Sequence, residues 1–447
     1  MKVGLVSLGC PKNLVDSEIM LGLMKNGGFD FEVDLSKSDV IVVNTCGFID
    51  DAKIESTNKI LEVAKHKEEG KCKALIVTGC LAERYSDGIL TSIPEVDAVL
   101  GTAAYGDIVE TIKSILTNKN HHISIIKPQT DISWLENDRI LSSSNGSAYL
   151  KISEGCDNKC TYCIIPSLRG PFRSRDIKSI IAEASKLALS GIKEVILVGQ
   201  DTTRYGIDLY SKPALVELIG GISDIEGIEW IRLLYCYPEM VSDELINEIA
   251  TNDKVCKYID VPIQHSSDRI LKKMGRRTNT IELVDLIKRL REANPLICIR
   301  STFIVGFPGE TAEDFQNLKA FISDSKLDYV GVFCYSQEEG TPAATFDGQI
   351  PGKTAKSRQK QLMKVQNVIS ATKLENRVGK SYKVLVDNVS DDGIFYFGRS
   401  QFEAPEIDGQ IYFTSKWPLK SGDMVNVQIL NSEDYDLIGD VKNEPAK

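Results

Sequence analysis

The feature that most constrains this fold is a repeated alternation of short apolar segments with amphipathic ones. Short runs rich in Val, Ile and Leu recur along most of the 447 residues, and many are followed by apolar residues spaced three or four positions apart. The runs are typical of strands buried on both faces, and the spacing is typical of helices. Strands that alternate with helices predict an α/β protein built on parallel sheets.

Residues 1–117 predict an N-terminal, Rossmann-like parallel α/β domain. The glycine-terminated helical patterns are residues 14–28 and 52–70. The predicted strands are residues 2–8, 39–44, 73–78 and 96–100. Residues 118–147 lose this periodicity and predict a connecting segment.

Residues 148–378 repeat strand then helix six times, which predicts a partial (βα)₆ barrel of the TIM type, short of the usual eight units. The expected strands are residues 148–153, 194–199, 230–236, 258–263, 297–306 and 329–335. Residues 355–379 predict a long helix that closes this domain.

Residues 379–447 predict a small antiparallel β-barrel, because short alternating runs are separated there by Gly, Asp and Asn. This segment holds seven Lys or Arg against twelve Asp or Glu, a net charge of −5. An RNA-binding barrel is normally basic. The charge therefore favours a basic protein as partner.

Composition predicts a cytoplasmic protein with neither a membrane partner nor direct DNA binding. The net charge of −10 disfavours a large nonspecific contact with nucleic acid. No run of 18 apolar residues occurs, and the N-terminal apolar run is typical of a buried strand rather than a signal peptide. Eleven cysteines are an odd number, and in a reducing compartment they indicate metal ligands rather than disulfides.

Three cysteines, Cys156, Cys160 and Cys163, form a CxxxCxxC loop directly after a predicted strand. Three thiolates on an iron–sulfur cluster leave one iron open to another ligand. Zinc is the alternative, but structural zinc sites have four protein ligands and no His lies in this loop.

Three further cysteines, Cys10, Cys46 and Cys80, each follow a predicted parallel strand, at intervals of 36 and 34 residues. The carboxyl ends of neighbouring parallel strands meet at one edge, so these thiols are expected to converge and to hold a second cluster. The alternative is that each is a small buried apolar residue.

The segment "CDNKCTYC" resembles the signature of radical S-adenosylmethionine (SAM) enzymes. The resemblance implies a 4Fe–4S cluster on Cys156, Cys160 and Cys163, with SAM as its fourth ligand and source of a deoxyadenosyl radical. It places Tyr162 near the adenine. The segment "STFIVGFPGE" is similar to the family's SAM-contacting strand, which suggests Ile304 and Gly306. Gln200 follows the second barrel strand at the same mouth and is a further SAM candidate.

The segments "SLGCPKNLVDSE", "NTCGFI" and "TGCLAERY" resemble the N-terminal domain of radical SAM methylthiotransferases, and the last segment resembles their TRAM (OB-like) barrel. The resemblance puts an auxiliary 4Fe–4S cluster on Cys10, Cys46 and Cys80. Pro11, Lys12 and "FGRSQFEAPEIDG" are similar to the branch that methylthiolates an aspartate β-carbon of small-subunit ribosomal protein S-twelve. The acidic barrel favours the same branch, because ribosomal proteins are basic.

The resemblance implies that SAM is both the radical and the methyl source, and that a flavodoxin or ferredoxin type donor supplies electrons. Two alternatives are the same chemistry on tRNA adenosine and a non-enzymatic, ribosome-associated iron–sulfur protein. Arg169, Arg173, Arg175 and His265 are candidates for substrate binding, since they lie in the loops expected at the barrel mouth. The alternatives are a solvated basic turn for the arginines and a structural role for His265.

Overall fold

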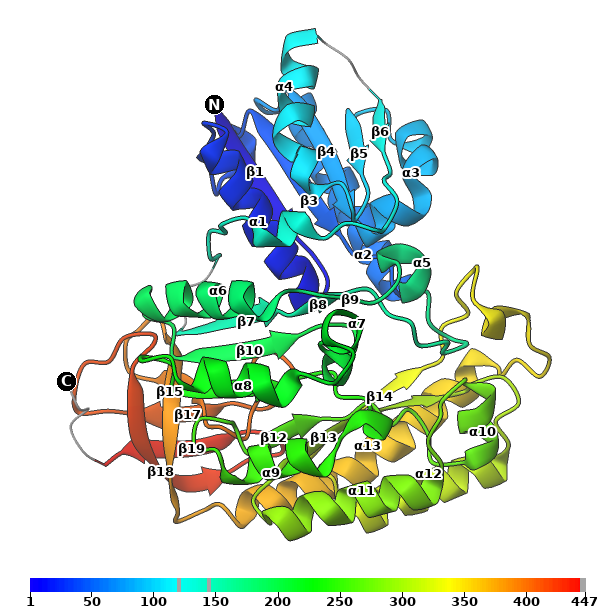
Figure 1. Ribbon diagram of the computed structural model, residues 1–447, viewed down its shortest axis with the longest axis vertical. Coiled ribbons are helices and arrows are strands. Elements are labelled where there is room, and N and C mark those ends of the chain that lie inside the picture. Colours follow the sequence, from blue (N-terminus) through cyan, green and yellow to red (C-terminus); the bar gives the residue numbers. More distant parts are fainter. Residues whose placement is uncertain (119–121, 143–145, 443–447) are drawn as a thin grey trace.

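The computed structural model describes residues 1–118, 122–142 and 146–442. An N-terminal α/β unit lies above a central open barrel, and a small closed barrel packs beside the central one (Figure 1). Residues 119–121 and 143–145 of the predicted connecting segment, and residues 443–447 of the last predicted domain, lie outside the described residues. Within the described ranges, no helix is long and apolar enough to cross a membrane.

The N-terminal unit is a parallel sheet of six strands in the order β2-β1-β3-β4-β5-β6, which is the flavodoxin-like variant of the doubly wound, Rossmann-like arrangement. Every residue of β3 and β4 is buried, which explains their unbroken apolar sequences. The strands are β1 (Lys2–Ser7), β2 (Asp30–Phe31), β3 (Val40–Thr45), β4 (Ala74–Gly79), β5 (Ala98–Leu100) and β6 (Ile123–Ile125). The helices are α1 (Pro11–Asn26), α2 (Asp50–Ala64), α3 (Cys80–Ser92) and α4 (Ile108–Asn118).

Strand β6 lies in the segment that the sequence predicts to be connecting structure. It pairs with β5 and extends the sheet at its edge. Its three residues are only partly buried or exposed, so they show too little apolar periodicity to be recognised as a strand.

The central domain consists of two parallel sheets of three strands, β11-β10-β7 and β12-β13-β14. A bridge between Ile231 and Val255 joins the sheets, so the strands form one open barrel of six βα units, as predicted. The strands are β7 (Ser147–Lys151), β10 (Glu194–Val198), β11 (Trp230–Leu233), β12 (Tyr258–Asp260), β13 (Cys298–Val305) and β14 (Tyr329–Cys334). The main covering helices are α6 (Ile177–Leu189), α8 (Leu215–Ser223), α9 (Asp243–Thr251), α11 (Thr280–Ala293), α12 (Ala312–Ser325) and α13 (Gly352–Glu375).

The C-terminal domain is a closed barrel in the order β15-β16-β17-β19-β18. The predicted barrel is confirmed, except that β17 and β19 pair in parallel whereas the other pairs are antiparallel. The strands are β15 (Ser381–Val389), β16 (Tyr396–Arg399), β17 (Ile411–Thr414), β18 (Met424–Ser432) and β19 (Leu437–Val441).

The C-terminal barrel covers the amino-terminal end of the central barrel. Ala404 is fully buried in one apolar cluster with Tyr258 and Tyr329, which begin two of the central strands. The hydroxyl of Tyr258 donates a hydrogen bond to Asp408 over 2.7 Å. With that end covered, the loops at the carboxyl ends of the strands are the place for a site.

A buried ion group holds the two barrels together. Glu194, the first residue of β10, accepts hydrogen bonds from Arg232 Nε at 2.6 Å and from Arg399 Nη1 at 2.9 Å. All three side chains are at most 2% exposed. Arg399 is also paired with Asp387, whereas Glu194 is the one carboxylate that pairs with Arg232 among the described residues, so the charge balance of Arg232 depends on Glu194.

We predict that Glu194→Gln lowers the free energy of unfolding by about 3–5 kcal/mol, because it leaves the buried cation of Arg232 without a paired carboxylate. The measurement is urea denaturation of the full chain. The matched control is Glu229→Gln, which removes an exposed pair with Lys383 between the same two domains and should cost less than about 1 kcal/mol. Equal losses of unfolding free energy in the two variants would contradict the role of Glu194 as the partner of a buried arginine.

Candidate active site

The CxxxCxxC loop lies just past the carboxyl end of β7, between β8 (Ser153–Glu154) and α5 (Ile165–Arg169). Cys156 and Cys160 are buried and Cys163 is partly buried. The N–H of Cys156 donates to the carbonyl of Gly170 over 3.0 Å, so the loop folds back on itself. The backbone thereby brings three thiols of one short segment to one place.

A cation and an aromatic hydroxyl lie against this loop. Arg276 Nη1 is 3.8 Å from the Sγ of Cys160 and its guanidinium stacks on Tyr237, whose hydroxyl oxygen is 3.9 Å from the same sulfur. Burial raises the pKa of Cys163 to about 12 and raises that of Cys156. Metal binding must therefore displace protons from these thiols.

The N-terminal cysteines follow three neighbouring strands. Cys10 caps α1 after β1, Cys46 comes directly after β3, and Cys80 is the first residue of α3 after β4. Burial raises the pKa of Cys46 to about 12, and the nearby thiols of Cys80 and Cys10 add to the increase. A Cβ on Gly9 would lie only 2.7 Å from Cys46 Cβ, so glycine lets two of these loops touch.

Both triads fit iron–sulfur clusters by their chemistry. All eleven cysteines are free thiols, and neither triad includes a histidine or carboxylate. Among the described residues, no three His, Cys, Asp or Glu side chains form a group that could hold a single metal ion. Cys thiolates are the ligands that hold iron–sulfur clusters.

A buried ionic group connects the two triads. Arg169, at the end of α5, places its Nε 3.4 Å from Cys80 Sγ and its Nη1 2.7 Å from Asp16 of α1. Glu154 accepts from both Arg169 and Lys151, and Lys151 also donates to Asp16. Burial opposes the ionisation of Glu154, but Lys151 and Arg169 outweigh it and lower its pKa to about 2. We call these four residues the ionic group.

Apolar packing brings the triads to one mouth. Ile164, the neighbour of Cys163, and Leu168 form a buried cluster with Cys80. In Figure 1, α5 lies where the N-terminal sheet meets the central barrel. The arrangement joins two sets of thiols from separate domains at a single interface.

The predicted SAM residues occupy two environments. Tyr162 and Ile304 pack against the same small apolar cluster. Gln200 donates to Glu154 over 2.6 Å, while its buried carbonyl oxygen has no partner among the described residues. The N–H of Gly306 donates to Glu310, and a Cβ there would lie 2.5 Å from Ala355 Cβ, so this glycine serves close packing against α13.

The predicted substrate residues do not converge. Arg169 belongs to the ionic group, and Arg173 donates to the carbonyls of Pro171 and Arg169. Arg175 is paired with Glu136 and Glu183, which attaches the connecting segment to α6. His265 is fully buried, and its Nδ1 accepts a hydrogen bond from the N–H of Ser267. The geometry gives no support to substrate binding by Arg175 or His265.

Several polar residues beside the triads were not predicted. Asn13 and Asp16 lie three and six positions after Cys10, and helical spacing puts them on one face of α1, a signal that the sequence carries. Asn13 donates to the carbonyl of Thr45 and accepts from Arg169. No sequence pattern indicates a role for Arg276, because only the tertiary fold brings it to Cys160.

Lys12 lies between the domains as well. Its Nζ is 3.2 Å from the ring centroid of Tyr235, which follows β11. Burial lowers the pKa of Lys12. The side chain still retains some accessible surface, because it faces the space between the domains.

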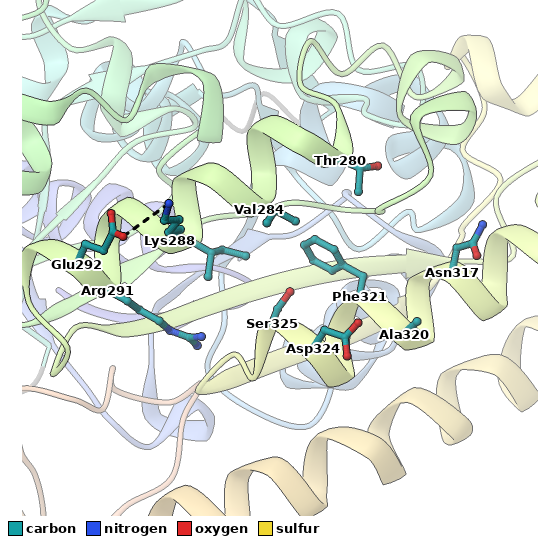
Figure 2. Close-up of a pocket in the computed structure, with 11 residues that line it drawn as sticks. Thr280, Val284, Lys288, Arg291, Glu292, Asn317, Ala320, Phe321, Asp324 and Ser325 are labelled. Carbon is teal, nitrogen blue, oxygen red and sulfur yellow. Dashed lines mark ion pairs between the residues drawn. The ribbon is translucent and has the colours of Figure 1, made fainter.

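One open groove of the molecule lies away from both triads. Figure 2 shows it between α11 and α12, where Lys288 and Glu292 form an ion pair at its rim. Its volume is about 650 Å³, but none of the predicted site residues lines it. The candidate active site is therefore the mouth between the domains.

Comparison with known proteins agrees with this architecture. Family models match residues 2–101 (Uncharacterized protein family UPF0004), 150–322 (Radical SAM superfamily) and 378–441 (TRAM domain). The solved structure of the radical S-adenosylmethionine methyltransferase TsrM from Kitasatospora setae has a TM-score of 0.57 at 14% identity, over 76% of this chain and 73% of that chain. The cobalamin-dependent S-adenosylmethionine radical enzyme OxsB has a TM-score of 0.51 at 13% identity, over 81% of this chain and 56% of that chain. Both show the shared fold.

Curated relatives match the whole chain. The ribosomal protein uS12 methylthiotransferase RimO of Acetivibrio thermocellus is 54% identical over 100% of this chain and 99% of its own length. The protein of that name from Clostridium botulinum is 51% identical over the same shares. The chain belongs to the family of ribosomal protein uS12 methylthiotransferases, which are radical SAM enzymes.

Proposed function

We propose that this chain adds a methylthio group to the β-carbon of an aspartate in ribosomal protein uS12. The full-length relatives support the substrate. The observation that carries the mechanism is the contact of Arg169, six residues after Cys163, with Cys80 Sγ. A reaction that needs two clusters at one substrate requires such adjacency.

Two 4Fe–4S clusters and SAM are the cofactors. We propose Cys156, Cys160 and Cys163 as ligands of the cluster that binds SAM, and Cys10, Cys46 and Cys80 as ligands of the other. When bound, the first cluster with SAM supplies a hydrogen-abstracting radical, and the second supplies the sulfur.

The remaining residues bind SAM and keep water out of its site. Tyr162 and Ile304 give the SAM site an apolar wall. The unpartnered carbonyl oxygen of Gln200 is an acceptor for the amino group of SAM. Nearby, Asn158 donates to the buried carboxylate of Asp201 over 2.8 Å, which orients a second acceptor at the strand end. The proposed reaction needs no strong general base among these residues.

We propose that uS12 contacts the enzyme where all three domains meet. A hollow of about 150 Å³ is lined there by Leu14 of α1, Tyr149 of β7 and Glu406 of the C-terminal barrel. Several acidic residues of that barrel form internal ion pairs, whereas others are exposed. The exposed ones are Asp391, Asp392, Glu406, Glu433 and Asp434.

These exposed acids favour a basic protein over a nucleic acid, because complementary charge steers association and like charge opposes it. The tRNA alternative is not favoured on this ground, nor by the relatives. We propose an external electron donor of the flavodoxin or ferredoxin type, and a cytoplasmic location where ribosomal proteins are present.

We predict that Cys46→Ala and Cys156→Ala each bind about half the iron of the parent chain after anaerobic reconstitution, because each removes one ligand set. Cys46→Ala should still cleave SAM under reduction, and Cys156→Ala should not. Cys334→Ala is the control, because this partly exposed thiol of β14 lies outside both triads. Full iron content in Cys46→Ala would show that the N-terminal triad is not a ligand set.

We predict a methylthio adduct on an aspartate of uS12 when the reconstituted enzyme, SAM and a reductant are incubated with it. Unmodified tRNA serves as the parallel substrate, and mass spectrometry reads both products. An adduct on tRNA alone would contradict the proposed substrate. Cleavage of SAM with neither adduct would contradict it too.

A further inference from the structure

We propose that Lys12 binds the carboxylate of the substrate aspartate and so selects this residue in uS12. The inference rests on the proposed function and names the group that recognises the reacting side chain. It starts from a lysine whose charged side chain is unfavourable for folding at its position.

Three features make Lys12 unfavourable for folding. It lies in the first turn of the 16-residue helix α1, where the helix dipole opposes a positive charge, and no acidic residue occurs in that turn. It is largely enclosed by protein atoms, which costs hydration of the ammonium. Within the described residues, its Nζ forms no hydrogen bond or ion pair.

The carboxylates nearest Lys12 are committed to other partners. Asp260 is paired with Arg300 at 3.0 Å and accepts from the N–H of Tyr235. Glu154 is held by Lys151 and Arg169. Lys12 is thus a cation near the triads that has no paired carboxylate among the described residues.

The surface beneath Lys12 is built at a cost. Tyr235 has a φ of +61°, a left-handed conformation that bulky residues rarely adopt. Its N–H donates to Asp260 and its carbonyl accepts from Thr202, so the backbone is fixed from both sides. The Tyr235 ring lies against Lys12 Nζ, and an ammonium over an aromatic face can still donate hydrogen bonds to an anion on its other side.

Lys12 is also reachable. The residue retains accessible surface. Lys12 is two residues from Cys10, so a carboxylate bound there lies beside the N-terminal triad.

The test measures binding without turnover. The probes are uS12 and its variant with asparagine in place of the methylthiolated aspartate, and the protein is the reconstituted enzyme with SAM and no reductant. We expect the parent enzyme to bind the aspartate form about tenfold or more tightly, as for a hydrogen bond between charged groups. Lys12→Met should bind both forms alike, with unchanged iron content.

Matched variants separate the roles. Lys25→Met changes an exposed lysine at the far end of α1 and should keep the preference. Tyr235→Phe should keep it as well, whereas Tyr235→Leu should reduce it by about threefold. Retention of the preference in Lys12→Met, or loss of iron from that variant, would overturn the proposal. Failure of the parent enzyme to modify uS12 would instead overturn the proposed function.

Discussion

The structure depends most on the buried ionic group formed by Asp16, Lys151, Glu154 and Arg169. Asp16 comes from the N-terminal domain and the other three from the central barrel, and all are at most 3% exposed. Removing one member leaves an uncompensated charge in a dry interface, which is far more costly than losing a surface pair. The group therefore fixes one relative placement of the domains, and Arg169 extends that constraint to the thiol of Cys80.

The rest of the architecture keeps one end of the central barrel free for this interface. The C-terminal barrel covers the amino-terminal ends of the strands, where Glu194 compensates two buried arginines. The opposite end receives both cysteine triads, the residues proposed to bind SAM, and Lys12. The C-terminal barrel, which matches the TRAM domain model, thus serves as a structural cover and also carries several exposed acidic residues.

Much of the fold was predictable, because buried parallel strands such as Val40–Thr45 and Ala74–Gly79 have unbroken apolar sequences that periodicity detects. Short edge strands such as Ile123–Ile125 were missed, since they bury too little to leave a pattern. The convergence of Cys10, Cys46 and Cys80 followed from strand ends meeting at one edge. The environment of Arg175 could not be predicted, because neighbours in sequence point to different sides of a loop. Only its tertiary contacts with Glu136 and Glu183 reveal that it is engaged there.

The most direct test of the central claim, that two clusters adjoin at one interface, is electron paramagnetic resonance of the reconstituted enzyme with both clusters reduced. Cys46→Ala and Cys156→Ala supply the spectra of each cluster alone. Adjacent clusters should interact magnetically, so the spectrum of the parent enzyme should be broadened, or relax faster, relative to the sum of the two variants. A parent spectrum equal to that sum would show that the clusters lie far apart and would contradict the account.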